Sequence, residues 1–513
     1  MSNNSRVTKS IKNAQVAVIF YVINLLLQFF YRKVFLDYLG PEVLGLNSTA
    51  MNLLQFLNLA ELGIGAAVSY SLYSPLANND KQKITEIVSL QGYLYSRIGI
   101  IVLSAATLLM FFFPIFFSGI KIPIWYSYAT FVVLLISALA GYFLNYQQIV
   151  LTSDQKEYKL TYTIQAIRIL KVILQITLIY LLSNGYVWWL ILELIASVCT
   201  IFGIKYVMNL EYPWLKTNIH LGKQLMHKYP EITRKTKQLF THKIAGFALN
   251  QGSPLIIFAF TSLSFVSVYG NYLLVIAGIT ALLGSVFNSI NAGVGNLVSE
   301  GNMKKILSIF EELFAIRYLL ACVACYGVYK LTPIFITYWV SKEYLLPTSS
   351  LILMVIIMYI NITRQTVDSF LNAYGLFNDV GAPIIETIIN IGLSILLGYF
   401  YGINGILIGV IASLLIIVFC WKPFFLFQQG FKLNIKFYIL MYIKLLLIVV
   451  LPFFLTEYLI DLFKIDPYFS LLNFLLYTVI IMLVFFTLLI SGLLIFTSGI
   501  RQFYERCKAY LVK

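Results

Sequence analysis

The sequence predicts an all-α polytopic membrane protein with about 14 transmembrane helices, arranged as two six-helix lobes around a central cavity plus two C-terminal helices. Three observations lead to this fold class. Of the 513 residues, 60% are hydrophobic and only 11% are charged, which is far more apolar than a soluble domain. The apolar residues gather in runs long enough to cross a bilayer. The basic residues cluster in the short connections between these runs.

The apolar runs between turn and charge clusters define the predicted spans. In chain order they are 14–37, 43–75, 85–117, 123–150, 157–182, 186–209, 237–262, 266–299, 305–338, 346–375, 380–400, 403–427, 433–460 and 468–500. Several exceed the roughly 20 residues that cross a bilayer, so we expect those helices to tilt, bend or extend beyond the lipid. Pro254 predicts a kink in the seventh span. The first run lacks a small-residue cleavage site, which indicates a retained span rather than a removed signal.

The basic residues predict the orientation of the chain. With the N-terminus inside, 24 of the 36 Lys and Arg residues, Lys422 among them, fall on the cytoplasmic side. Six, including Arg32, fall on the opposite side, and the remaining six lie within spans. Since basic residues concentrate in cytoplasmic connections, both termini are predicted to be cytoplasmic.

The longest polar connection, 210–236, divides the predicted spans into six before it and eight after it. We therefore predict an N-lobe over residues 1–209, a basic cytoplasmic connection over 210–236, a C-lobe over 237–430, and spans thirteen and fourteen with a cytoplasmic tail over 431–513. Leu44–Asn47 resembles Val268–Asn271, and both following helices end in connections that contain Asn and Lys. An even number of spans in each lobe makes this a parallel repeat, a plan found in transporters.

Several functions are excluded by what the chain contains. The net charge of +15 comes from membrane connections, so we expect no nucleic-acid partner. The sequence has no phosphate loop and no His-Glu-x-x-His motif, and its connections are too short for a catalytic domain. We expect no enzyme activity, no cofactor and no metal site. Cys322 and Cys325 are interpreted as packing residues. A sugar polymerase or transferase remains an alternative, for which Glu457, Asp461 and Asp466 form the available acidic group.

Ionisable side chains within predicted spans are the strongest indication of function, because a charge at bilayer depth requires a partner or a water-filled cavity. Five of them form a candidate cationic cavity for substrate: Arg97, Arg168, Lys171, Arg317 and Arg364. Arg168 and Lys171 are three residues apart and share one helix face, so they need a counter-anion. That anion comes either from the protein or from a ligand such as a phosphate. Structural pairing or snorkelling is the alternative.

Glu61 and Asp368 are candidates for ion coupling or for a helix switch. Arg364 and Asp368 are four residues apart, the spacing of an intrahelical ion pair, which either neutralises itself or exchanges partners during transport. Glu61 adjoins small residues that allow close helix approach, so it is either a structural anchor or a proton or sodium site. Glu193 and Glu386 are expected to pair with the cations.

Several motifs resemble those of one transporter family. The sequence Tyr38–Asn47, followed by Leu59–Gly65 and Tyr70–Ala77, resembles bacterial polysaccharide flippases. These are the O-antigen, capsule and exopolysaccharide repeat-unit translocases of the multidrug/oligosaccharidyl-lipid/polysaccharide exporter superfamily. Further similarity occurs in His242–Gly246 and Asp379–Pro383, and it fades in the last two spans.

The resemblance implies a flippase that moves an undecaprenyl-pyrophosphate-linked oligosaccharide from the inner to the outer leaflet of the bacterial cytoplasmic membrane by alternating access. Its partners would be the lipid-linked substrate, membrane lipids and other polysaccharide-assembly membrane proteins. A multidrug exporter of the same superfamily is the nearest alternative, for which about twelve spans and an acidic pocket are expected.

Overall fold

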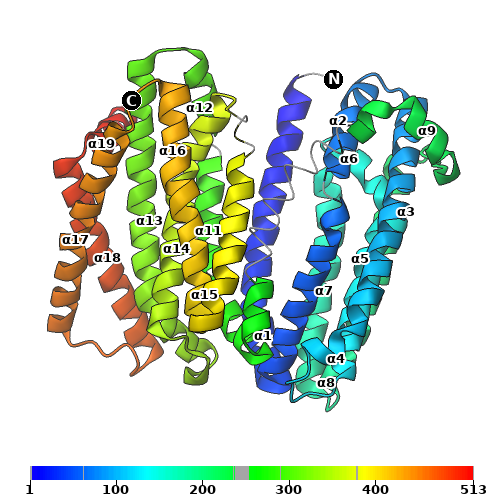
Figure 1. The fold of residues 1–513 in the computed structure, drawn as a ribbon, viewed down its shortest axis with the longest axis horizontal. Coiled ribbons are helices and arrows are strands. Elements are labelled where there is room, and N and C mark those ends of the chain that lie inside the picture. The colour runs from blue at the N-terminus through cyan, green and yellow to red at the C-terminus, as the bar shows by residue number, and fades with distance from the viewer. Residues whose placement is uncertain are drawn as a thin grey trace. The chain divides into compact units, whose positions relative to one another are not determined.

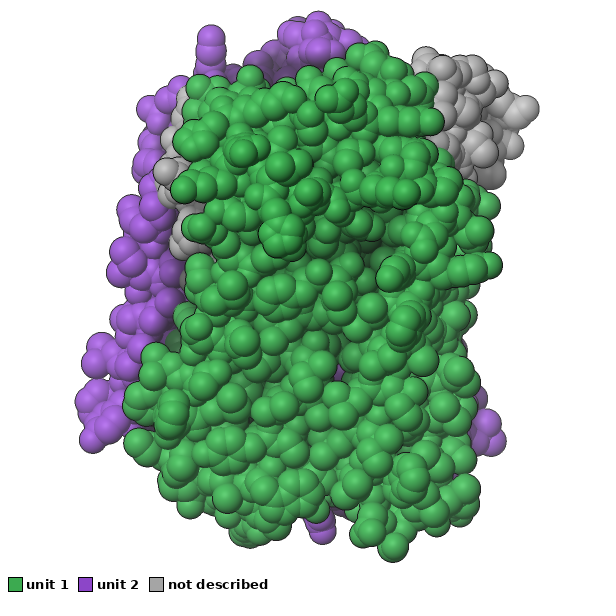
Figure 2. Space-filling model, turned by 90° about the vertical axis from the view of Figure 1, so that its right-hand side faces the viewer, with its two compact units in different colours: residues 1–267 green, residues 268–513 purple. Residues whose placement is uncertain are grey.

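The computed structural model describes residues 3–61, 63–234, 236, 254–288, 291–376, 379 and 381–511, and these residues form helices, turns and short connections without a strand. The prediction of an all-α fold is confirmed. The chain divides into two compact units, residues 1–267 and residues 268–513, which are shown in different colours in Figure 2. Figure 1 labels the helices.

The first unit contains the helices of the predicted spans one to six. They are α1 Asn3–Leu57, η1 Asn58–Glu61, α2 Ile64–Ala77, α3 Lys81–Phe111, α4 Phe113–Phe116, α5 Trp125–Phe143, η2 Tyr146–Gln148, α6 Ile149–Ser153, α7 Glu157–Leu181, α8 Gly185–Glu211, η3 Ile219–Leu221 and α9 Gly222–Lys228. α11 Leu263–Asn288 begins in this unit and continues into the second one.

The second unit contains the helices of the later spans. After α11 they are α12 Asn291–Ser299, α13 Met303–Trp339, η4 Lys342–Tyr344, α14 Thr348–Ala373, α15 Gly381–Ser413, η5 Leu414–Trp421, α16 Lys422–Phe425, η6 Leu426–Phe431, α17 Lys436–Phe463, α18 Leu471–Phe496 and α19 Ser498–Leu511. η5 and η6 are π-helical turns in the second arm of residues 381–431, a segment called the 381–431 rod below, which reverses direction at Gly402.

The predicted spans correspond to helices throughout the described residues. Ten helices there are long and apolar enough to cross a membrane, so the chain is a multi-pass membrane protein. Two of the ten contain a reversal and account for two predicted spans each: α1 reverses at Gly40, with φ 83°, and the rod 381–431 reverses at Gly402, with φ 57°. α13, which carries more charge, matches the ninth span. Most of the seventh predicted span, including the residues just before Pro254, lies outside the described residues.

The second predicted span, 43–75, is not one helix. α1 ends at Leu57, a 3₁₀ turn follows over Asn58–Glu61, and α2 begins at Ile64 after Gly63. Gly63 has φ 102°, a backbone conformation that glycine adopts without the penalty of a Cβ. The helix is therefore interrupted beside Glu61.

The helix boundaries repeat at a constant interval. α3 has Asp80 as its N-cap residue and α13 has Asn302, which lies 222 residues later (302 minus 80), and each side chain accepts a hydrogen bond from a lysine backbone N–H three residues on. The preceding residues, Asn79 and Gly301, both have positive φ. α2 ends at Ala77 and α12 ends at Ser299, again 222 apart (299 minus 77). The two halves of the chain thus follow one plan in the same direction.

The predicted lobe limits stay a prediction. The compact units divide at Ser267, whereas the predicted boundary is the connection 210–236, and residues 237–253 between the two positions are outside the described part of the chain.

Basic connections of the first unit lie together at one end of its helices. The start of α1 lies at that end in Figure 1, together with α2, α6 and α9. The Asn13 amide donates to the Gln155 carbonyl oxygen at 3.2 Å, and the Asn218 backbone N–H donates to the Ser89 hydroxyl at 3.0 Å. These hydrogen bonds join connections that are far apart in the sequence. This agrees with the prediction that the connections lie on the same side of the membrane.

Lys156 is fixed at this end by two carboxylates. Its ammonium lies 2.7 Å from Asp154 and 3.4 Å from Glu211. Burial alone would lower the pKa of the Lys156 ammonium, but the hydrogen bonds and charges of Asp154 and Glu211 outweigh burial and raise that pKa. The group is therefore a permanent cation at neutral pH.

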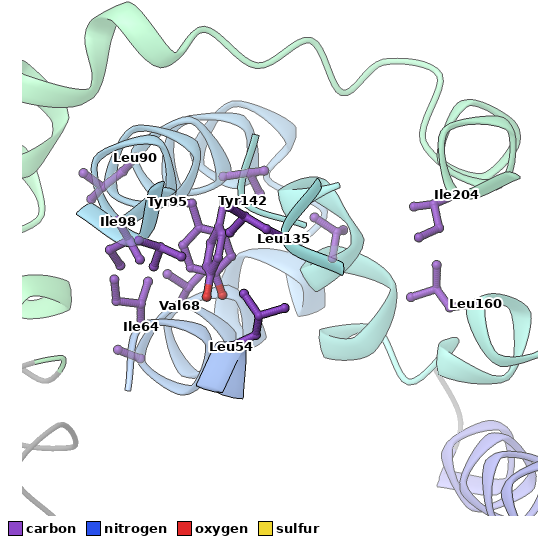
Figure 3. Packing of buried hydrophobic residues seen from close by; sticks show 14 of the residues in the cluster. Leu54, Ile64, Val68, Leu90, Tyr95, Ile98, Leu135, Tyr142, Leu160 and Ile204 are labelled. Atoms are coloured by element: carbon purple, nitrogen blue, oxygen red, sulfur yellow. The ribbon is translucent and has the colours of Figure 1, made fainter. Parts of the chain in front are cut away.

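Each unit has its own packed interior. In the first unit, residues of α1, α2, α3 and α5 interdigitate, with Leu54, Val68 and Leu135 around the rings of Tyr95 and Tyr142 (Figure 3). In the second unit, the Phe310 ring has its centroid 5.2 Å from Phe370 and 5.3 Å from Phe431. Such aromatic pairs stabilise the packing of one helix against another within the bilayer.

The two arms of the 381–431 rod are packed backbone against backbone. A Cβ on Gly409 would lie 2.4 Å from the Ser394 backbone nitrogen, and one on Gly405 would lie 1.9 Å from the Leu397 carbonyl oxygen. Across the same contact Asn390 donates to the Ser413 hydroxyl at 3.2 Å. Small residues allow this approach, and the interarm hydrogen bonds stabilise it.

We expect Gly409→Leu to lower the free energy of unfolding by about 1–3 kcal/mol, because the new side chain must force the arms apart. The matched control is Gly392→Leu on the same helix, where a Cβ meets nothing within 4 Å. Thermal unfolding in detergent would measure both variants. Equal melting temperatures for the two variants would contradict the close packing.

Candidate functional site

A cationic pocket lies among α1, α5, α7 and α8 of the first unit. It encloses about 190 Å³, and its ionisable lining residues are Arg32, Arg168, Lys171 and Glu193. Neutral polar groups complete the lining, namely Asn24, Gln28, Tyr31, Asn47, Ser48 and Gln175. Arg168 and Lys171 therefore line the same cavity. Their spacing of three along α7 explains why the two side chains share it.

Lys171 is neutralised by the protein. Its ammonium lies 2.7 Å from Oε1 of Glu193, and only 20% and 13% of the two side chains are exposed. Gln175 donates to the same carboxylate oxygen at 3.0 Å. The expectation that Glu193 pairs with a cation is confirmed for Lys171.

The two arginines give this pocket its positive charge. Arg32 donates from Nη2 to the Ser267 carbonyl oxygen at 2.9 Å. Arg168 is exposed along α7. Among the described residues, the lining of the pocket contains three basic side chains and one carboxylate. An anion with several oxygens, such as a phosphate, is the ligand that two guanidinium groups bind best.

Arg32 was missed as a site residue, because the orientation argument placed it with the connections of the opposite side. The structure places it within α1, well before the reversal at Gly40. Arg32 lies within the first predicted span, 14–37, eight residues before that reversal.

Arg97 lies elsewhere in the first unit. Its guanidinium carbon is 4.9 Å from the centroid of the Tyr93 ring, one turn earlier on α3, and it does not line the cationic pocket. A cation over an aromatic face is stabilised without a carboxylate partner.

In the second unit Asp368 joins two cations. Its Oδ2 lies 3.0 Å from Nε of Arg364, and its Oδ1 lies 2.9 Å from Nζ of Lys422. The ion pair that the spacing of four predicts is confirmed. Lys422, placed by sequence in a cytoplasmic connection, comes from α16 and shares the carboxylate. Asp368 therefore holds α14 to the 381–431 rod.

Arg317 is the most deeply buried of the predicted cations. It is 4% exposed, its guanidinium carbon lies 4.5 Å from the centroid of the Phe287 ring, and its Nε and Nη1 have no hydrogen-bond partner among the described residues. Glu312, five residues earlier on α13, pairs with Arg506 at 2.8 Å. A buried guanidinium with unfilled donors is costly unless an anion or water meets it.

Glu61 lines a different cavity of the first unit, about 470 Å³ in volume. The Tyr95 hydroxyl donates to Glu61 Oε1 at 2.7 Å, and the Tyr142 hydroxyl donates to Asn58 Oδ1 at 2.9 Å. The carboxylate thus lies at the break between α1 and α2, held by a residue of α3. The five predicted cations and Glu61 with Asp368 are divided between two units: Arg317, Arg364 and Asp368 lie in the second.

Comparison with known proteins identifies the fold. No protein-family profile matches the sequence, and no curated protein is significantly similar to it. Among solved structures, the chain shares its fold with a lipid II flippase and with a multidrug transporter of the MOP superfamily.

Two structures represent that fold. The lipid II flippase MurJ in an inward closed conformation has a TM-score of 0.64 and 17% identity, over 93% of this chain and 99% of that chain. An inward-facing multidrug resistance MATE transporter of the MOP superfamily has a TM-score of 0.54 and 16% identity, over 80% of this chain and 97% of that chain. Both matches extend over almost all of the known protein.

Removing the carboxylate of Asp368 should destabilise the second unit. We expect Asp368→Asn to lower the free energy of unfolding by about 3–5 kcal/mol, because two cations lose their partner in a poorly solvated site. Glu300→Gln is the control, since the Glu300–Lys305 pair is more than half exposed and should cost under about 1 kcal/mol. Unfolding in detergent at several salt concentrations checks both, and similar losses for the two variants would argue against a structural role for Asp368.

Proposed function

We propose that this protein is a flippase that moves an undecaprenyl-pyrophosphate-linked oligosaccharide repeat unit across the bacterial cytoplasmic membrane. The cargo would serve the synthesis of a cell-surface polysaccharide such as O-antigen, capsule or exopolysaccharide. Transport proceeds by alternating access, without a chemical reaction on the cargo. Both termini lie in the cytoplasm in this proposal, in keeping with the basic connections.

The observation that carries the proposal is the cationic pocket of the first unit. Two guanidinium groups, Arg32 and Arg168, accompany a Lys171 that Glu193 already neutralises. A pyrophosphate offers several anionic oxygens, and each guanidinium can donate two parallel hydrogen bonds to such a group. The polar residues around the arginines can take the sugar hydroxyls of the cargo.

The fold supports the same class of cargo. The structure named lipid II flippase MurJ covers 93% of this chain with the higher TM-score of the two comparisons. A lipid-linked sugar leaves its polyprenyl tail in the bilayer, so the transporter needs to enclose only the polar head. The predicted spans beyond the twelve expected of a multidrug exporter, α17 and α18, are both present.

A multidrug exporter is the competing function, favoured by the MATE comparison and by the acidic cavity around Glu61. A cationic drug would bind a carboxylate and be repelled by two arginines in the neighbouring pocket. Extrusion of a cationic dye by the purified protein in vesicles, with no effect of gene deletion on surface polysaccharide, would establish this alternative.

We expect Arg168→Ala combined with Lys171→Ala to abolish export of repeat units without lowering the amount of protein in the membrane. Loss of one charged hydrogen-bonding partner costs about 1.5–3 kcal/mol, so Arg168→Ala alone should lower export roughly 10- to 100-fold. The measurement is repeat units on the outer leaflet of a deletion strain that carries each variant.

The matched control removes a charge pair instead of a free charge. Lys171→Met with Glu193→Gln deletes the ion pair and keeps the net charge of the pocket, so export should fall much less than with Arg168→Ala. Wild-type export by the Arg168→Ala, Lys171→Ala variant would remove this pocket from the transport route. Unchanged surface polysaccharide after deletion of the whole gene would end the flippase proposal.

A further inference from the structure

We propose that α19, the last helix of the second unit, is a binding surface for the headgroups of anionic phospholipids. This inference does not rest on the proposed cargo. α19 runs over Ser498–Leu511 and is separated from the membrane-spanning α18 by one residue, Thr497. Figure 1 shows α19 at the end of the second unit where α13 begins. Because a span ends where the lipid tails meet the headgroups, α19 starts at the surface of the bilayer.

One face of α19 is bound to α13. Gln502 accepts a hydrogen bond from the Ser308 hydroxyl at 2.7 Å. The Arg506 guanidinium lies 2.8 Å from the carboxylate of Glu312, whose residue is only 4% exposed. A Cβ on Gly499 would lie 2.5 Å from a backbone oxygen of α13, so the two helices touch there. Positions 499, 502 and 506 share one helix face, and that face is taken up by the protein.

The opposite face of α19 carries Arg501, Tyr504 and Lys508, called the outer stripe below. These positions are the docked ones moved on by two residues, which is about 200° around the helix. All three residues are exposed, and 59% of Tyr504 is accessible. The outer stripe therefore lies on the side of α19 that is turned away from α13.

The residue types of the outer stripe fit the boundary between lipid tails and headgroups. Tyrosine is enriched there because its ring is apolar and its hydroxyl is polar. Arg and Lys lay their apolar stems along the lipid and extend their charged ends to the phosphates. Phe503 adjoins the stripe and is 39% exposed, so a second ring is available to the same apolar layer. Short helices that bind membrane surfaces combine these residue types.

The charge of this face favours an anionic lipid. Glu505 is the acidic residue of α19, against the cations Arg501 and Lys508 of the stripe. Arg501 donates from Nε to the Leu494 carbonyl oxygen at 2.6 Å and also bonds the carbonyl of Ile495. These carbonyls end α18 and carry only partial negative charge, so the guanidinium stays a net cation. An anionic headgroup supplies the full charge that a zwitterionic one lacks.

α9 of the first unit shows that charge alone does not make such a surface. It packs Gly222 and Leu225 toward the protein and exposes Lys223 and His227. Its seven residues include no aromatic ring. α9 thus has the ordinary solvated face of a surface helix. α19 differs because its exposed face combines cations with an aromatic residue and begins directly after a span.

The test places a fluorescent reporter on the outer stripe. Tyr504→Trp in the full-length protein, reconstituted in phosphatidylcholine vesicles, adds emission that is read as the difference from the wild type. We expect brominated phosphatidylglycerol to quench this added emission at a lower mole fraction than brominated phosphatidylcholine. Unlabelled phosphatidylglycerol should relieve the quenching, and inorganic phosphate should not.

Two further changes in the Tyr504→Trp protein should act in opposite directions. Lys508→Gln should lower the preference for phosphatidylglycerol about fivefold, the effect of one basic residue near an anionic surface. Glu505→Gln should raise the preference, because it removes a repelling charge. The matched control is Tyr468→Trp at the other end of the second unit, where Lys342 lies 5.7 Å from the tyrosine ring. Quenching at that position should not change with Lys508→Gln.

Absence of quenching by either lipid overturns the proposal, because the face would then lie in water or under a protein partner. Equal quenching by the two lipids overturns the headgroup preference, and so does an unchanged preference in Lys508→Gln. Relief by inorganic phosphate would assign the stripe to a soluble anion instead. The substituted residues are exposed, so wild-type melting temperatures are expected and separate these outcomes from misfolding. Export of repeat units is measured independently and decides only the cargo.

Discussion

The free-energy cost of an unpaired charge in the apolar bilayer is the constraint on which the helix contacts of this protein depend. Each ionisable side chain that enters the apolar interior must find compensation there. Lys171 finds Glu193, and Asp368 draws Arg364 and Lys422 onto one carboxylate. The contacts that result also connect helices, since α7 is joined to α8 and α14 to α16. Among the described residues, Arg97, Arg168 and Arg317 have no carboxylate within ion-pair distance, and they are for that reason the informative ones.

Periodicity and spacing made much of this architecture predictable. Runs of apolar residues located the spans because the length of a span is set by the thickness of the bilayer. Spacing of four along one helix predicted the Arg364–Asp368 pair, since neighbours on a helix face are a local matter. Glu193 was expected to pair with one of the cations within the spans, and the structure shows that this cation is Lys171.

Contacts that depend on three dimensions could not be predicted. The contact of Lys422 with Asp368 was not predicted, because it joins two helices at positions 54 residues apart in the sequence. The break at Gly63 was hidden in a run that reads as one span. Gln91 gave no signal at all, since a neutral amide among apolar residues becomes notable only when its unfilled oxygen is seen to line a cavity. Arg32 was not predicted as a site residue, because the count of basic residues had assigned it to the side opposite the cytoplasm.

The close contact of Gly405 and Gly409 with the opposite arm limits how far the two arms can slide past one another. Two helices that touch through side chains can slide by exchanging rotamers, but two that touch through backbone cannot change register without separating first. We therefore expect the two arms of the hairpin from Gly381 to Phe431 to move as one rigid unit. Lys422, and with it the contact to Asp368 on α14, is then expected to move together with both arms of the hairpin.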